Sequence, residues 1–386
     1  MRILHLLKTA NGADWAFRQM KELVKLGLEI HVAAPDDGPM IEYFHEAQIT
    51  WHPKNYDIAG KKPWEWLALF HDLKRLISDI QPDLIHSHFV GTTLTMRFAL
   101  GKENRTPRIF QVPGPLHLEN KLIRKSEIFS AGRNDYWVGS RKWTCDSYLG
   151  EGIPREKIFL SYYGLELDRF RCARKGKLRK ELKIDPGVKI IGMVAHLYPP
   201  KRYLGKMRGI KGHEDLIDAI AICSQNYPNI MGVMVGGAWQ KAFHYENKVI
   251  EYGKRKCPRK VIFLGNRSDV PEIYPDFDVA VHPSHSENLG GAAESLLAGI
   301  PTIATAVGGF PDIVKPNETG WLVPARKPSR LADVILEALR DPIRAIAMAK
   351  EGKKLVKSML DIRNTAKEIS EIYRQIYSVR KGCFKT

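Results

Sequence analysis

The chain has 386 residues, of which 44% are hydrophobic and 27% are charged, and its formal net charge at pH 7 is +17. The length indicates two domains rather than one core, and the composition is ordinary for a soluble globular protein. No run of 18 apolar residues is present, which excludes a membrane-spanning helix, and the first residues lack the pattern of a signal peptide. The five cysteines are scattered and never form C-x-x-C, which argues against a disulfide framework or a zinc site and predicts a cytoplasmic location.

The positive charge is concentrated in the middle of the chain. Residues 171–260 contain 20 Lys+Arg against 7 Asp+Glu, whereas residues 1–170 contain 23 against 21. A local basic field favours anionic partners, here a nucleotide diphosphate, anionic lipid headgroups or nucleic acid. A solvated basic surface without a ligand explains most of these residues equally well.

Short apolar runs alternate with amphipathic stretches along the whole chain. The first series of predicted strands covers residues 2–8, 29–34, 84–88, 108–112, 136–140 and 158–162, with helices over 14–26 and 64–80. The second series covers residues 189–195, 230–235, 261–264, 279–282 and 301–305, with helices over 213–225 and 331–339. Apolar strands that alternate with helices predict a parallel sheet covered on both faces. The fold class is therefore α/β, with two doubly wound Rossmann-like domains.

The predicted domain boundary falls in a polar, basic segment near residues 168–186. We assign residues 1–170 to the first domain, 171–364 to the second and 365–386 to a C-terminal helix. That helix carries Ile369, Ile372, Tyr373 and Ile376 at a spacing that buries one face. A ligand held between two such domains would lie in a central cleft, at the carboxyl ends of both sheets.

The most informative stretch covers residues 281–301. It is read as a buried strand followed by Glu287, a glycine pair (Gly290 and Gly291), and a helix that carries Glu294. A strand that turns through glycine into a helix directs free N–H groups and the helix dipole at one point, which suits a phosphate. Carboxylates repel phosphate and suit hydroxyl groups instead. A phosphate and a polyol on one site indicate a nucleotide sugar.

Other loops at the carboxyl ends of predicted strands supply further candidates. Gly12 and Gly236 follow strands at turns where a ligand can approach the backbone, although most such turns contain glycine in any case. A basic loop before the helix at 213–225 holds Arg202, Arg208 and Lys211, and cations at this place suit a diphosphate.

Three histidines and one acidic pair are candidates for catalytic or metal-binding groups. His86 and His88 share one face of a strand, but the spacing suggests no third ligand, so the pair is not interpreted as a metal site. His117 follows a strand and is an active-site candidate. The D-F-D at residues 276–278 precedes a buried strand, where acids commonly serve turns and caps, so we predict no required metal.

With these residues in place, the chain closely resembles the glycosyltransferase family 4 enzymes over essentially its whole length. The strongest motifs are H-P-S-H-S-E-N-L-G-G-A-A-E-S-L-L-A-G-I-P and N-E-T-G-W-L-V-P, supported by F-L-G-N-R-S-D-V-P-E-I-Y and Y-G-L-E-L-D-R-F. The resemblance implies a GT-B fold, retaining sugar transfer from a nucleotide sugar without a metal ion, a donor site in the C-terminal domain, and a last helix that crosses back onto the N-terminal domain.

The resemblance also implies roles for individual residues. Glu287 matches the glutamate near the donor sugar, and Glu294 matches the one that binds the ribose. Lys211 matches the lysine that neutralises the diphosphate, and Gly12 the glycine loop that faces the donor phosphate. The turn that presents N–H groups to the diphosphate is matched by Gly290, Gly291 and Ala292.

Three positions depart from the family pattern. The two glutamates are separated by six residues instead of seven, which indicates a tightened turn. His196 stands where the family has an arginine, and the sequence leaves open whether Arg202 or Arg208 replaces it. Pro113 stands where the family has its N-domain histidine, and His117 is the candidate substitute.

The expected function is hexosyl transfer from a nucleotide diphosphate sugar, with a UDP-sugar favoured over a GDP-sugar, to a glycan or lipid-linked glycan. Glu287 and His117 are the predicted catalytic residues, and no cofactor is expected. The expected partners include the anionic inner face of the membrane, which the protein would contact peripherally. The nearest alternative is a GT-B sugar-nucleotide epimerase. A nucleic-acid-binding protein is less favoured because aromatic residues do not interleave with the basic cluster. A dinucleotide-dependent oxidoreductase is also less favoured, because no complete G-x-G-x-x-G follows a strand.

Overall fold

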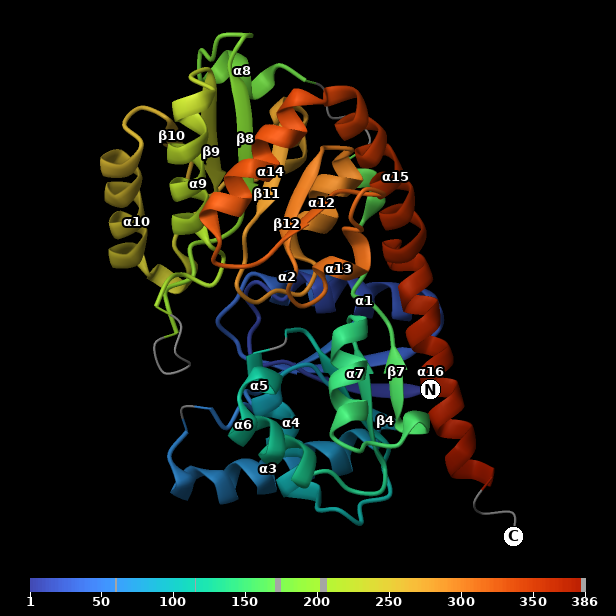
Figure 1. Cartoon of the computed structure of the whole chain (residues 1–386). Coiled ribbons are helices and arrows are strands. Elements are labelled where there is room, and N and C mark those ends of the chain that lie inside the picture. Colours follow the sequence, from blue (N-terminus) through green and yellow to red (C-terminus); the bar gives the residue numbers. More distant parts are fainter. Residues whose placement is uncertain (60, 115, 171–174, 202–206, 383–386) are drawn as a thin grey trace. The chain divides into compact units, whose positions relative to one another are not determined.

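The computed structural model describes residues 1–59, 61–114, 116–170, 175–201 and 207–382 and divides the chain into two compact units (Figure 1). Unit 1 comprises Met1–Glu166 and Met359–Thr386, and unit 2 comprises Leu167–Ser358. Among the described residues, no helix combines the length and the apolar character that crossing a bilayer requires.

Unit 1 is built on a seven-stranded parallel sheet with the order β3-β2-β1-β4-β5-β6-β7. Its strands are β1 (Arg2–Leu6), β2 (Glu29–Ala34), β3 (Thr50–Pro53), β4 (Leu84–Ser87), β5 (Arg108–Val112), β6 (Asp135–Gly139) and β7 (Ile158–Leu160). The helices are α1 (Asp14–Lys25), α2 (Met40–Glu46), α3 (Trp66–Ile80), α4 (Val90–Leu100), α5 (Leu116–Glu119), α6 (Lys121–Phe129), α7 (Lys142–Gly150) and α16 (Ile362–Gly382). The strand order reverses between β1 and β4.

The ends of unit 1 are joined by packing between the first and the last helix. In α1, the apolar Ala16, Met20 and Leu23 recur at helical spacing and are buried, and the chain turns away just after the helix at Gly27, whose φ is +80°. The Leu28 N–H donates to the Leu23 carbonyl, which closes the helix end in a Schellman arrangement. Helix α16 packs against α1, and its Ile369, Tyr373 and neighbouring apolar residues enter the same core as α1.

Unit 2 is built on a six-stranded parallel sheet with the order β10-β9-β8-β11-β12-β13. Its strands are β8 (Lys189–Val194), β9 (Ile230–Val235), β10 (Val261–Phe263), β11 (Val279–His282), β12 (Thr302–Thr305) and β13 (Trp321–Val323). The helices are α8 (Lys177–Glu181), α9 (His213–Asn226), α10 (Phe243–Lys256), α11 (Val270–Ile273), α12 (Gly290–Ala298), α13 (Phe310–Ile313), α14 (Pro328–Arg340) and α15 (Pro342–Leu360), the last of which extends two residues past the unit boundary.

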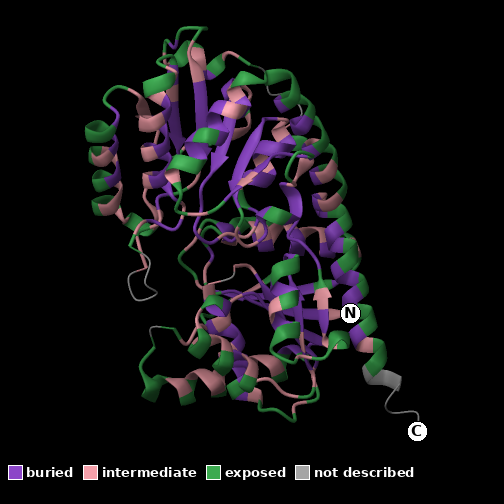
Figure 2. Ribbon diagram, in the orientation of Figure 1, coloured by how far each residue is buried: buried purple, intermediate pink, exposed green. Residues whose placement is uncertain are grey.

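Both predicted parallel sheets are present, so the α/β fold class is confirmed. Figure 2 shows the central strands of both sheets buried and the outer faces of the helices exposed. Two short strands at sheet edges, β3 and β13, were not predicted. The unit boundaries fall after Glu166 and Ser358, a few residues before the predicted ones. In unit 2 the strand order reverses between β8 and β11, and ligands of doubly wound folds bind outside the carboxyl ends of such strands.

Candidate active site

A pocket of about 140 Å³ lies at the carboxyl ends of β8 and β11, at the topological switch point of unit 2. Consecutive residues at the end of β8, the loop before α9 and the loop after β11 form its wall. The lining residues are Met193, Val194, Ala195, His196, Tyr198, Lys211, His282, Ser284, Glu287 and Gly291. The pocket therefore brings together Lys211, Glu287 and Gly291, which the sequence singled out from two distant segments.

Glu287 is held by one cation and two hydrogen bonds. The Lys211 ammonium forms an ion pair with its carboxylate, the Ser284 hydroxyl donates at 3.3 Å, and the Asn288 N–H donates at 3.0 Å. Burial by itself would raise the pKa of Glu287, but Lys211 and the hydrogen bonds outweigh it and hold the pKa below its usual value. Glu287 is therefore an ionised carboxylate at neutral pH, and its counter-charge stands in the same pocket.

The glycine turn brings the start of α12 against the end of β8. A Cβ at Gly291 would lie 2.8 Å from the His282 ring and 2.9 Å from the Val194 carbonyl oxygen, so only glycine fits without a shift. Gly290 has a φ of +41°, which favours glycine as well. The buried Ala292 follows in the first turn of α12, whose N–H groups have no intrahelical partner in any α-helix. These N–H groups and the helix dipole suit a phosphate.

Tyr198 lines the pocket and is backed by Trp239. Tyr198 stacks on Trp239 with the ring centroids 4.7 Å apart, and the Lys211 ammonium lies 5.4 Å from the Tyr198 centroid. The His196 ring lies 5.4 Å from Trp239. The sequence did not indicate Tyr198, because it stands in the segment after β8 where no motif or spacing distinguishes it from other loop residues.

Two family domains together match most of the chain. Residues 15–169 match the glycosyltransferase family 4 domain, and residues 175–355 match the domain described as glycosyl transferases group 1. The chain belongs to the family 4 glycosyltransferases.

Curated relatives of this glycosyltransferase carry transferase names. The D-inositol 3-phosphate glycosyltransferase of Corynebacterium urealyticum is 30% identical over 51% of the chain and 46% of its own length. The mannosyltransferase LpsB of Rhizobium meliloti, named for lipopolysaccharide core biosynthesis, is 24% identical over 55% of the chain and 60% of its own length. The chain thus spans only about half of these two relatives. The capsular polysaccharide biosynthesis glycosyltransferase CapM of Staphylococcus aureus is 23% identical over 99% of both chains.

Solved structures share the fold of this glycosyltransferase. HepE from Anabaena, solved in complex with UDP, superposes with a TM-score of 0.81 at 20% identity and covers 97% of this chain and 100% of its own. Sucrose-phosphate synthase from Thermosynechococcus elongatus gives a TM-score of 0.80 at 20% identity, over 98% and 100% of the two chains. The GT-B fold that the resemblance implies is confirmed.

The remaining donor-site candidates of the glycosyltransferase have different surroundings. Glu294 lies on α12 outside the pocket lining, and the buried Tyr274 hydroxyl donates to its carboxylate at 3.4 Å. A Cβ at Gly236 would lie 2.2 Å from the Ala195 carbonyl oxygen, so the close approach of β8 and β9 already explains this glycine. Arg202 lies outside the described residues. Arg208 lines another pocket and binds Asp215 and Asp218 at 2.6 and 2.8 Å.

The candidates in unit 1 are Gly12 and His117. Gly12 has a φ of +71° in the turn between β1 and α1, which fits a glycine loop. His117 lies on α5, buried against Phe110, and its Nε2 is 3.2 Å from the Tyr148 hydroxyl. Burial, with a smaller effect of Arg141, lowers the pKa of His117 to about 3, so the ring is neutral. Its catalytic role stays a prediction.

His86 and His88 belong to a cluster of three buried histidines in unit 1. The expectation of a missing third imidazole was wrong, because β1 pairs with β4 and places His5 beside His86. His5 Nδ1 lies 2.9 Å from His88 Nε2, and one ring nitrogen from each of the three residues lies within 4.8 Å of the other two. Hydroxyl groups contact two of the rings, Tyr373 at His86 and Tyr163 at His88. These contacts account for the cluster as a hydrogen-bonded part of the core.

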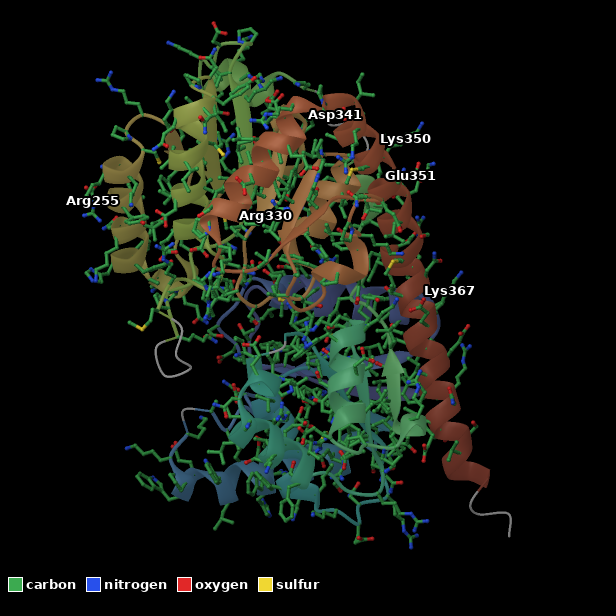
Figure 3. The ribbon with its side chains drawn as sticks, in the orientation of Figure 1. Arg255, Arg330, Asp341, Lys350, Glu351 and Lys367 are labelled. Carbon is green, nitrogen blue, oxygen red and sulfur yellow. The ribbon has the colours of Figure 1, made fainter. Side chains whose placement is uncertain are left out.

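Many basic residues of unit 2 lie away from the pocket. Figure 3 shows Arg255 of α10 extending outward from the ribbon, and the adjacent Lys254 is exposed as well. Arg179 pairs with Asp278 at 2.7 Å. Much of the basic segment is therefore solvated or locally paired, and Lys211 is the cation among the described residues that lines the pocket.

Proposed function

We propose that this family 4 glycosyltransferase transfers a hexosyl group, with retention, from a UDP-sugar to a glycan or lipid-linked glycan acceptor. The observation that carries the proposal is the ionised Glu287 beside Lys211 and the glycine turn, at the switch point of unit 2. The names of the relatives, among them capsular polysaccharide biosynthesis for CapM, favour a polysaccharide acceptor. The UDP and UDP-glucose bound to HepE favour a UDP-sugar over a GDP-sugar.

In the proposed reaction, the bond between the anomeric carbon and the β-phosphate oxygen breaks, and negative charge develops on that phosphate. The Lys211 ammonium and the N–H groups at Gly290, Gly291 and Ala292 stabilise this charge as fixed cation and dipoles. The acceptor oxygen attacks the oxocarbenium-like sugar on the face that the phosphate leaves, which gives retention, and the acceptor proton passes to the phosphate. Glu287 orients the sugar hydroxyl groups, and Glu294 binds the ribose.

We propose further that transfer needs no metal ion. The two acids of the D-F-D segment both have structural partners, which supports this. Asp276 accepts hydrogen bonds from the Gly176 and Leu178 N–H groups, at 2.6 and 2.7 Å, and so caps the start of α8. Asp278 pairs with Arg179 and accepts from the Ile190 N–H at 2.9 Å.

Calorimetric titration with UDP, GDP and ADP, with EDTA present, tests the donor and the metal together. We expect UDP to bind most tightly and EDTA to leave its affinity and the transfer rate unchanged. Loss of transfer in EDTA with recovery in Mn²⁺ would refute the metal-free proposal. Incubating a UDP-sugar without acceptor separates transfer from the alternative, because an epimerase forms a new sugar nucleotide and a transferase does not. The anomeric coupling constant of the product, read by NMR, reports retention.

Glu287→Gln tests the role of the carboxylate. The substitution keeps the size of the side chain and removes its charge, so we expect turnover to fall by about 100-fold or more while UDP affinity changes little. Glu272→Gln is a matched control, since Glu272 is an exposed carboxylate of the same unit that pairs with Lys177. A loss of UDP affinity in Glu287→Gln, with unchanged turnover of bound donor, would show that Glu287 holds the nucleotide instead.

We also propose peripheral contact with anionic lipid. Helix α10 supports it with the exposed Lys254, Arg255 and Lys256 and with Phe243, which is 59% exposed. Basic residues near an anionic surface gain about 1 kcal/mol each. Flotation with vesicles of neutral lipid and with vesicles that contain anionic lipid checks the proposal. Equal recovery with both would contradict it.

A further inference from the structure

A cluster of charged side chains with a buried pair at its centre, His285 and Asp215, lines a second pocket of unit 2 next to the loops of the active-site pocket. His285 Nε2 lies 2.5 Å from Asp215 Oδ2, and these side chains are only 2% and 4% exposed. Arg208 donates to Asp215 at 2.6 Å and to Asp218 at 2.8 Å, and the Tyr252 hydroxyl donates to Asp218 at 2.5 Å. The proposed transfer uses none of these groups.

The cluster connects the two loops that carry Lys211 and Glu287. Asp215 lies in the first turn of α9, four residues after Lys211, and His285 lies two residues before Glu287. The loops are also in direct backbone contact, because the His285 N–H donates to the Ile210 carbonyl at 2.7 Å. A Cβ at Gly212 would lie 2.1 Å from the Pro283 carbonyl oxygen. Two side-chain pairs thus span the same junction, Lys211 with Glu287 and Asp215 with His285.

The chemistry of the cluster defines the protonation of its central pair. Burial acts to raise the pKa of Asp215, but hydrogen bonds from His285 and Arg208 outweigh it, so the pKa lies below its usual value. The ionised Asp215 then requires a proton on His285 Nε2 at a separation of 2.5 Å. His285 Nδ1 is buried without a hydrogen-bond partner among the described residues. The ring is therefore held from one side, by a carboxylate that Arg208 holds in turn.

The hydrogen bonds of this network are better suited to holding a loop in one position than to stabilising the fold as a whole. Buried ion pairs contribute little stability relative to well-packed apolar residues, whereas their directional hydrogen bonds restrict where each partner can lie. Active-site groups must be held within about 0.5 Å of the productive geometry, and a displacement of about 1 Å can lower the rate about 100-fold. The junction at residues 209–215 and 283–287 sets the distance between the proposed phosphate ligand and the proposed sugar ligand.

We propose that His285 and Asp215 are positioning residues that hold the loops of Lys211 and Glu287 in the arrangement that sugar transfer requires. Arg208 belongs to the same device, since it orients Asp215 and does not face the pocket. The inference rests on the proposed function, because its effect is read as a transfer rate.

The test compares His285→Ala, His285→Gln and Asp215→Asn with Asp276→Asn. Asp276 is a fully buried carboxylate of the same unit that caps α8, so its substitution matches the loss of a buried charge away from the loops. We measure kcat and KM for the UDP-sugar, the Kd of UDP and the melting temperature. His285→Ala should lower kcat about 10- to 100-fold, with UDP affinity reduced much less. His285→Gln, whose amide still donates to Asp215, should recover most of kcat.

Asp276→Asn should lower the melting temperature without lowering kcat. The inference is overturned if His285→Ala keeps wild-type kcat, or if Asp276→Asn lowers kcat equally at an equal loss of melting temperature. Should His285→Ala not fold, Asp215→Asn decides, since this near-isosteric variant with wild-type kcat would overturn the inference as well. A wild-type chain that neither binds UDP nor transfers sugar refutes the proposed function and the inference together. Wild-type transfer with unaffected variants refutes the inference alone.

Discussion

Lys211→Met tests the central electrostatic feature of the site. Methionine keeps the length of the side chain and removes the ammonium, so Glu287 stays buried with only the hydrogen bonds from Ser284 and Asn288. Breaking a buried pair by removing one partner costs about 3–5 kcal/mol. The side chains of Lys211 and Glu287 are 19% and 12% exposed, so we expect the lower end, about 3 kcal/mol. For a unit of this size, that corresponds to about 6–12 °C in melting temperature.

The pH dependence of this loss identifies its cause. In the wild type the pKa of Glu287 is depressed, so the pair stabilises the fold above the unfolded pKa of about 4.3 and loses its effect as the pH falls through the folded pKa. In Lys211→Met, burial is no longer offset and the pKa of Glu287 rises above its usual value. The variant then binds a proton in the folded state, so its deficit should shrink as the pH falls from 7.5 to 4.5.

Urea unfolding of both proteins at several pH values measures the deficit. Adding Glu287→Gln to Lys211→Met should recover most of the stability, because the pair is then removed as a whole. Lys354→Met is the control, since Lys354 forms an exposed ion pair with Glu351 and should be close to wild type. A deficit below about 1 kcal/mol at pH 7.5, the level of an exposed pair, or a deficit independent of pH, would refute the reasoning.

Gly291→Ala should weaken UDP binding by about tenfold or more in calorimetry, since a new methyl group displaces α12 from β8; an affinity within twofold of wild type would contradict this. Tyr373→Phe removes the hydroxyl that contacts His86 Nδ1 and leaves a buried ring nitrogen unpaired. Urea unfolding should show a loss of about 1–3 kcal/mol, and no loss would argue against the contact. Burial lowers the pKa of His5 to about 3, so the unfolded chain binds the proton first and the stability of unit 1 should fall as the pH drops below about 6.5. Unfolding at pH 7 and pH 5 should show a smaller fall in His5→Asn, and an equal fall would refute this origin.

The sequence predicted the parts of the fold that follow from periodicity. The strands β1, β4, β8 and β11 are short, largely buried and rich in apolar residues, so their positions followed from the sequence even though β1 carries His5 and β4 carries His86. The edge strands β3 and β13 could not, because β3 is partly exposed and ends in Pro53, and β13 has only three residues. A short run of this kind does not differ in sequence from a loop.

The same distinction applies to the site. Lys211, Glu287 and Gly291 could be brought together from the sequence because each follows the carboxyl end of a strand at the switch point. His5 could not be added to His86 and His88, since the pairing of β1 with β4 depends on the order of strands and not on spacing. The dyad of Asp215 and His285 joins residues 70 positions apart and has no motif.

The basic segment shows why net charge alone is a poor guide to the ligand. Its excess of lysine and arginine favours any anion, but the structure assigns Arg179 to Asp278 and Arg208 to Asp215 and Asp218. Charges matched within about 4 Å contribute little to the field beyond a Debye length of about 8 Å. In the described lining of the pocket, Lys211 supplies the positive charge and Glu287 faces it. Anion binding there competes with a carboxylate, which suits a ligand that brings both a phosphate and hydroxyl groups and is unsuited to a simple polyanion.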